Sequence, residues 1–163
     1  MSNPILRNKV ADYIDVSDTG TPEFVLCGVG FNTLNESPGA QMDTKTYVNE
    51  EQSSTTIKSY QPTFPFDTDM IMDEEAVNKI YEIGRDKKTG AAAMIGYVRV
   101  DLFNPATTPA TGYNARKYTV SVEVASIEGE AGGVMKMTGN FHAYGAPVAG
   151  TFDPTTKAFT ATV

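Results

Sequence analysis

Residues that commonly carry chemistry are scarce in this chain. It has one cysteine, one histidine and no tryptophan among 163 residues. A single cysteine cannot form an intrachain disulfide, and Cys27 lies among apolar neighbours, where a small buried side chain is expected. Zinc usually takes four nitrogen or sulfur ligands, more than Cys27 and His142 supply. The sequence therefore predicts no catalytic residues, no metal site and no cofactor, and the chain is not expected to be an enzyme.

Long apolar runs and an excess of basic residues are also missing. No stretch approaches the roughly eighteen apolar residues of a membrane span or the core of a secretory signal, so no membrane contact is expected. Thirteen basic residues stand against twenty acidic ones, a net charge of −7. A chain of this sign would be repelled by phosphate, which argues against tight nucleic-acid binding. We expect a soluble protein of a reducing cytosol.

Two motif-like stretches do not carry chemistry either. Gly28-Val29-Gly30 opens like a dinucleotide-binding fingerprint but lacks the third glycine and the following helix. The acidic run from Asp67 to Glu75 fails as a calcium loop, because Met72 stands where that loop needs glycine and Asn78 where it needs a bidentate acid.

The remaining pattern is mainly β. Residues 94–103, 117–126 and 134–144 alternate in the manner of strands, and a final hairpin turns at Asp153-Pro154. In residues 94–103 the alternation puts Tyr97 and Arg99 on the polar side, opposite Val98 and Val100. Short strands joined by turns predict two packed antiparallel sheets, a sandwich or barrel. Without an internal linker, residues 1–163 are expected to form one domain with an N-terminal arm over residues 1–22.

One helix is expected over residues 73–86. Its spacing places one set of side chains on a single face, which should pack on a sheet: Ala76, Val77, Ile80, Tyr81 and Ile83. Asp73 is the expected N-cap, and Gly84 falls in the last turn, where glycine costs least.

A long polar segment over residues 31–54 separates the first apolar strand from the next extended segments. Loops of this length usually carry function. Several aromatic residues lie beside loops or on the polar side of strands and suggest a surface for protein contact: Tyr47, Tyr60, Phe64, Phe66, Tyr97, Phe103 and Tyr113.

The segment TKTYVNEEQSSTTIKSYQPTFPF, beginning at Thr44, resembles a characteristic stretch of the major tail tube proteins of long-tailed bacteriophages. The resemblance resumes in EEAVNKIYEIGRDKKTG, YVRVDLF and GTFDPTTKAFTA, and it extends over most of the chain from about Phe24. It implies a virion structural protein that self-assembles into hexameric rings. Stacked rings would form a hollow conduit for DNA ejection, with a tape-measure protein in the lumen during assembly in the host bacterial cytoplasm.

The resemblance also implies that the polar segment bridges neighbouring rings. The residues expected to contact the next ring are Asn32, Leu34, Asn35, Met42, Lys45, Tyr47 and Glu50. Glu123, between core positions Val122 and Val124, is the candidate for an acidic group facing the lumen, past which DNA would move without specific binding.

A different class of function remains open from the residues alone. A monomeric ligand-binding β-sandwich, such as a carbohydrate-binding module, would have a similar strand pattern. Such a module would align aromatic residues along one face, and the lack of tryptophan weakens this alternative.

Overall fold

The computed structural model describes residues 2–18, 20–107 and 111–162, and its chain is mainly β. Its elements, in chain order, are η1 Arg7–Lys9, β1 Val10–Asp15, β2 Phe24–Leu26, β3 Phe31–Leu34, β4 Ala40–Lys45, β5 Ser54–Tyr60, β6 Thr63–Asp69, α1 Glu75–Arg85, η2 Gly90–Ala93, β7 Met94–Pro105, β8 Tyr113–Glu128, β9 Lys136–Ala143, β10 Val148–Asp153 and β11 Ala158–Ala161.

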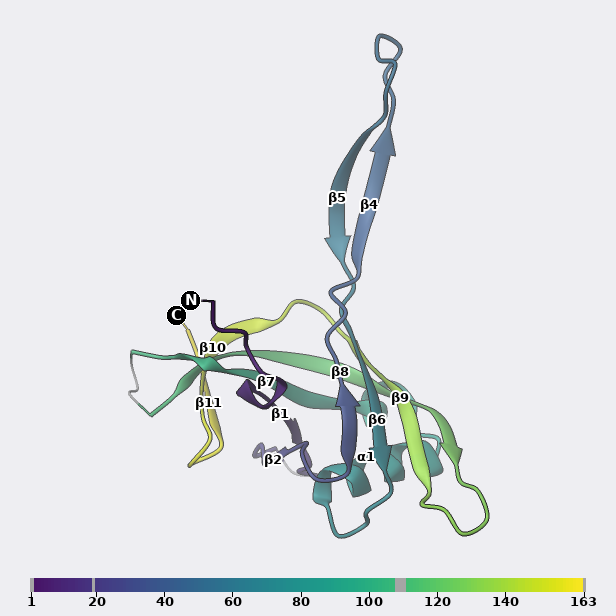
Figure 1. Cartoon of the computed structure of the whole chain (residues 1–163), viewed down its shortest axis with the longest axis vertical. Helices are drawn as coiled ribbons and strands as arrows, with labels where there is room; N and C mark the ends of the chain where they lie inside the picture. The colour runs from purple at the N-terminus through teal and green to yellow at the C-terminus, as the bar shows by residue number, and fades with distance from the viewer. Residues whose placement is uncertain (1, 19, 108–110, 163) are drawn as a thin grey trace.

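The main sheet is antiparallel, has nine strands and is strongly curled (Figure 1). Its path runs β2-β1-β7-β8-β9-β6-β3, and the β10–β11 hairpin branches from β8. The other two strands, β4 and β5, form a separate two-stranded sheet. The prediction of an antiparallel, mainly β fold with a flanking helix is confirmed, with one continuous curled sheet supplying most of the strands.

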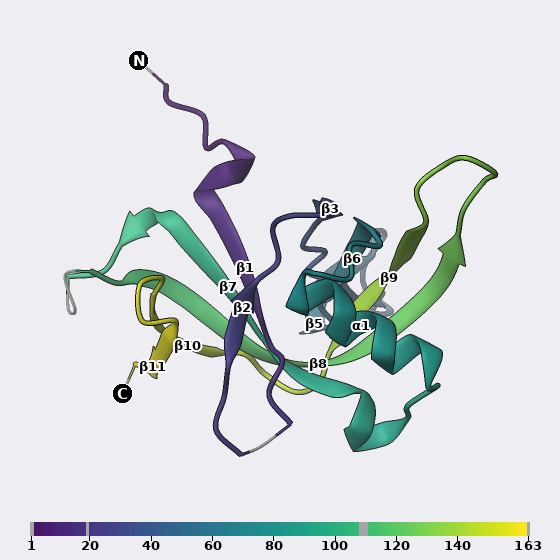
Figure 2. The same ribbon diagram turned by 90° about the horizontal axis from the view of Figure 1, so that it is seen from below.

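Helix α1 covers one face of the main sheet and packs mainly on β8 (Figure 2). Ala76, Val77, Ile80 and Ile83 are buried there and Tyr81 is half-buried, so the face defined by helical spacing is the packed one. The helix begins later than expected: Glu74 occupies the N-cap position without a side-chain capping bond, and Asp73 does not cap it.

Both faces of β7 are buried, which the alternation failed to predict. Tyr97 belongs to the core beneath α1, whereas Val98 and Val100 pack on the opposite face with Phe152 of β10. Alternate residues of a strand point to opposite faces, and here the curl of the sheet covers both. The polar side assigned to Tyr97 and Arg99 was therefore wrong.

The expected N-terminal arm is much shorter than residues 1–22. Residues 10–15 form β1, which pairs with β7 and buries Asp12, Tyr13 and Ile14. The apolar positions of β1 are too few to show a period in the sequence, and the strand is recognised only by its pairing. Residues 2–6 precede η1 and are exposed; Met1 and Thr19 lie outside the described residues.

Candidate functional site

A β-hairpin over residues 40–60, here called the projecting hairpin, extends away from the main sheet along the longest axis of the molecule (Figure 1). This region was predicted as a long loop over residues 31–54, and that prediction was wrong in its secondary structure. Phe31–Leu34 is β3 of the main sheet and Ala40–Lys45 is β4 of the hairpin. β5 coincides with the extended segment expected after residue 54. The start of β4 was missed because residues 40–43 are mostly polar and neither face of the hairpin packs on the core.

Every residue of β4 and β5 is exposed. The two faces of the hairpin nevertheless differ. Ala40 pairs with Tyr60 and Met42 with Ile57, whereas Gln41 pairs with Ser59 on the other face. Directly paired residues of antiparallel strands share a face. The register shift between Gln41 and Met42 places the Met42–Ile57 pair on the same face as the Ala40–Tyr60 pair.

The apolar face of the hairpin therefore consists of Ala40, Met42, Ile57 and Tyr60. Met42, Ile57 and Tyr60 are 67%, 57% and 59% exposed. A two-stranded hairpin is marginally stable by itself in water, and exposed apolar groups clustered on one face mark a contact surface. The geometry of the projecting hairpin thus suits packing against another protein surface.

The residues predicted to contact a neighbouring ring do not all lie on this surface. Met42, Lys45, Tyr47 and Glu50 are on the projecting hairpin and exposed. Asn32 and Asn35 are exposed but belong to the main sheet and the link that follows β3. The Asn32 Nδ2 group donates to Asp69 Oδ1 at 3.1 Å, at the end of β6 farthest from the hairpin.

Leu34 is a correction to that set. Its side chain is 1% exposed and belongs to the core beneath α1, so it cannot contact a neighbour. Leu34 is the last residue of β3, and pairing with Phe66 turns its side chain inward.

An ionic network that no local sequence pattern predicts lies at the base of the projecting hairpin. Asp12 of β1 is 2% exposed and accepts from Arg99 at 3.1 Å and from Tyr97. Arg7 donates to Asp12 at 2.9 Å. Glu36 accepts from Arg116 of β8 through both carboxylate oxygens, at 2.7 and 3.2 Å. These side chains come from segments far apart in sequence, which is why pattern analysis missed them.

The charges in this network are mutually compensating. Burial alone would lower the pKa of Arg99, but the Asp12 carboxylate, with smaller contributions from Tyr97 and Glu36, raises it above its ordinary value. Burial, together with the negative charge of Asp12, raises the pKa of the Tyr97 hydroxyl well above its usual range. Tyr97 thus stays protonated and Arg99 stays charged at neutral pH.

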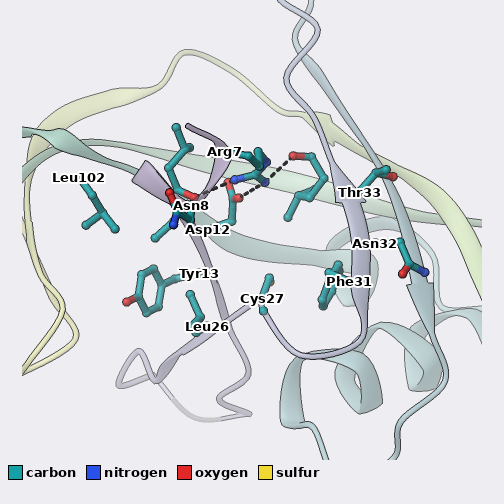
Figure 3. A pocket seen from close by; sticks show the side chains of 14 residues that line it. Arg7, Asn8, Asp12, Tyr13, Leu26, Cys27, Phe31, Asn32, Thr33 and Leu102 are labelled. Atoms are coloured by element: carbon teal, nitrogen blue, oxygen red, sulfur yellow. Dashed lines mark hydrogen bonds and ion pairs between the residues drawn. The ribbon is translucent and has the colours of Figure 1, made fainter. Parts of the chain in front are cut away.

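A cavity of about 570 Å³ adjoins this network between β1, β2 and β3 (Figure 3). Arg7 lies across one side, where its guanidinium donates to the carbonyl oxygens of Val10 and Leu34. The buried Cys27 lines the cavity, and burial raises the pKa of its thiol well above the ordinary value, so the thiol is protonated at neutral pH.

A polar face without a covering layer lies on β8 and β9, opposite the core. Glu123, Asn140 and His142 occupy it, while the alternate residues Val122 and Phe141 point into the core. The Glu123 carboxylate accepts from Asn140 at 2.8 Å and lies 3.0 Å from the Nε2 atom of His142. The hydrogen bond with His142 contributes most, and that from Asn140 next, to lowering the pKa of Glu123, so that its carboxylate is ionised at neutral pH.

Several aromatic residues expected at the surface are instead in the core. Phe64, Phe66 and Tyr97 are buried. The rings of Phe64 and Tyr97 pack against each other, with centroids 4.7 Å apart. These residues lie on β6 and β7, and the strand faces that were predicted to be exposed are covered by other parts of the protein. Tyr113 is half-buried. The aromatics that do remain exposed lie on different elements, Tyr47 and Tyr60 on the projecting hairpin and Phe103 on β7.

No group of three or more His, Cys, Asp or Glu side chains among the described residues is arranged to hold a metal ion. Across the same residues, none of the helices has the length and apolar character needed to cross a membrane.

Comparison with known proteins gives matches at the level of structure. No protein-family model matches the sequence, and no curated protein matches it. The SPP1 tail tube subunit has a similar fold, with a TM-score of 0.68 at 14% identity over 94% of this chain and 83% of that chain.

Two further tail structures resemble the chain. The tail of the empty GTA particle, solved by helical refinement with sixfold symmetry, gives a TM-score of 0.60 at 12% identity, over 97% of this chain and 100% of that one. The baseplate of the anti-feeding prophage gives 0.51 at 6% identity, over 94% and 98% of the two chains. At these identities the likeness establishes fold alone, and on that ground the chain has the fold of phage tail tube proteins.

Proposed function

We propose that this protein is the repeating subunit of a phage tail tube. Six copies form a ring, and rings stack into a hollow conduit through which DNA is delivered. The observation that carries the proposal is the projecting hairpin, which exposes an apolar face that its own chain does not cover. The shared fold with tail tube subunits supports the same assignment.

Stacking requires that the two ends of the subunit match, because a head-to-tail contact joins different surfaces of identical copies. The turn between β8 and β9 lies at the end of the molecule away from the projecting hairpin (Figure 1). Exposed apolar residues lie at this end of the molecule: Ile127 near the end of β8, and Val134 and Met135 in the turn. We propose that the apolar face of the hairpin packs on this end of a subunit in the next ring.

The conduit must let a polyanion pass without adhesion. The polar face of β8 and β9 is the proposed lumen wall, with Glu123 as its acidic group. A net charge of −7 per subunit, repeated around a ring, concentrates a negative field within the bore. DNA would then pass without specific binding, and during assembly in the host cytoplasm a tape-measure protein would fill the same space. The finished protein would reside in the virion tail.

Replacing the projecting hairpin tests its role in stacking. The Gln61 amide donates to the Gly39 carbonyl at 2.9 Å, so these two residues already lie side by side. Residues 40–60 can therefore be exchanged for Asn-Gly, the two residues favoured in a tight hairpin turn. The exchange leaves Leu34 and the core untouched.

We expect the shortened protein to keep its fold, because β4 and β5 bury none of their side chains in the core, but to form no long tubes. Circular dichroism reports the fold, and negative-stain electron microscopy of the concentrated protein reports rings and tubes. The full-length chain is the control. Long tubes from the shortened protein would remove the hairpin from stacking, and a full-length protein without rings or tubes would refute the proposed function.

A further inference from the structure

The base of the projecting hairpin is held by side chains as well as by backbone pairing. Glu36 lies in the link between β3 and β4. Arg116 donates from Nη1 to Glu36 Oε2 at 2.7 Å and from Nη2 to Oε1 at 3.2 Å, and Arg99 Nε lies 3.8 Å from Oε1. A planar guanidinium that engages both carboxylate oxygens fixes orientation as well as distance.

A second attachment holds the chain just before Glu36. Arg7 Nη2 donates to the Leu34 carbonyl at 2.8 Å and to Asp12 Oδ2 at 2.9 Å. Arg99 links Asp12 to the neighbourhood of Glu36. The base of the hairpin is therefore attached to β1 through Arg7 and Asp12 and to β8 through Arg116. Asp12, Arg99 and Arg116 are cross-strand partners and share one face of the curled sheet.

Beyond this base the hairpin has little to hold its direction. β4 and β5 make their main contacts with each other, and all their residues are exposed. At about 3.3 Å per residue, Ala40 lies about 30 Å from the tip. A tilt of about 10° at the base would move the tip by about 5 Å, more than a side-chain contact tolerates.

Stability alone does not account for such a network. Partly buried ion pairs lose much of their attraction to desolvation and are weak sources of stability, whereas they can specify one arrangement among several. The network surrounds the point at which the hairpin leaves the sheet, where an arrangement needs to be specified.

We propose that Glu36 is a positioning residue: its paired contact with Arg116, braced by Arg99, Asp12 and Arg7, sets the direction in which the hairpin projects. This inference rests on the proposed function for its purpose, since a fixed direction serves a hairpin that must meet a neighbouring ring. The geometric claim itself concerns the free subunit.

Pulsed electron paramagnetic resonance on the unassembled full-length chain tests the claim. Nitroxide labels are attached at Asn49→Cys, near the tip, and at Asn78→Cys, on the exposed face of α1. The native Cys27 is buried and is not expected to label. The distance distribution between the labels then reports hairpin direction, and the thermal midpoint reports stability separately.

We expect Glu36→Gln to broaden the distance distribution at least twofold. Glu51→Gln is the matched control: it removes the same charge from an exposed hairpin position outside the network and should leave the width unchanged. Arg116→Lys keeps the positive charge but loses the paired geometry. It should also broaden the distribution, and it serves as the second variant if Glu36→Gln does not fold.

An unchanged width in a folded Glu36→Gln or Arg116→Lys protein would overturn the positioning role, as would equal broadening by Glu51→Gln. Tube formation by the unaltered protein is scored separately by microscopy. If the unaltered protein forms no tubes, the distance distributions still test the positioning role of Glu36. If the distributions do not change, the microscopy still tests tube formation.

Discussion

Replacing Gly84 with alanine should destabilise the subunit, although alanine is the better helix former. Gly84 lies inside α1, in the last turn, and its φ is not positive. A Cβ atom at this position would lie 2.7 Å from Cγ2 and 2.8 Å from Cβ of Val124 on β8. Carbon atoms in favourable contact lie about 3.5–4.0 Å apart. The glycine is thus required by the close approach of helix and strand, not by a helix cap.

Two opposing magnitudes decide the sign. Glycine to alanine in a helix gains about 1 kcal/mol from backbone entropy, and less in a last turn. Inserting a methyl group into a filled contact costs about 1–3 kcal/mol. Because the clash involves the Cβ of Val124, which cannot rotate away, the upper part of that range applies. We expect a net loss of about 1–2 kcal/mol in the free energy of unfolding.

Urea denaturation followed by circular dichroism measures the change. A Val124→Gly background removes both of the contacting carbon atoms, Cβ and Cγ2, so the same Gly84→Ala change should be neutral or stabilising there, with a coupling energy of about 1–3 kcal/mol. Asn78→Ala, at an exposed position of the same helix, is the control for helix propensity alone. A Gly84→Ala protein that is more stable than the original would show that the helix does not approach β8 so closely.

Three further outcomes are expected. Ile57→Asp, on the apolar face of the projecting hairpin, should abolish long tubes in electron micrographs, whereas Thr56→Asp, on the polar face, should permit them; equal effects would contradict the assigned face. Glu123→Lys should leave the exposed site folded but make assembled tubes retain DNA more strongly at low salt than at high salt, and unchanged retention at every salt concentration would remove Glu123 from the lumen. Burial raises the folded-state pKa values of Cys27 and Tyr97, so the folded protein holds both protons more tightly. Their contribution to stability is present below the unfolded pKa values, about 8.5 and 10, and is lost as the pH rises. The free energy of unfolding should therefore fall above about pH 8.5, and urea titrations showing a rise instead would refute the burial of these groups.

Much of the main architecture follows from local pattern. The helical spacing from Ala76 to Ile83 identifies the packed face of α1, because a helix that covers a sheet must bury one side. The turn at Asp153-Pro154 marks the β10–β11 hairpin, in which the Thr155 amide donates to Asp153 Oδ1 at 2.9 Å. Cys27 is buried as its apolar neighbours indicate. The extended character of β5 was also recognisable from its Thr-rich sequence, whereas β4 was not predicted from Ala40.

The sequence by itself determined the β class, the helix and its buried face, the acidic charge and the scarcity of catalytic groups, because these depend on composition and on contacts between near neighbours. Tertiary structure alone decided that some strands are covered on both sides. The curl of the sheet buries both faces of β7, and a period of two cannot reveal that. It also decided that Leu34 lies in the core while Met42 is exposed, and it brought Asp12, Glu36 and Arg116 together. Ion pairs between distant segments leave no local sequence pattern. Each residue is positioned by its own strand, and the two partners come into contact only when the strands pair in the folded sheet.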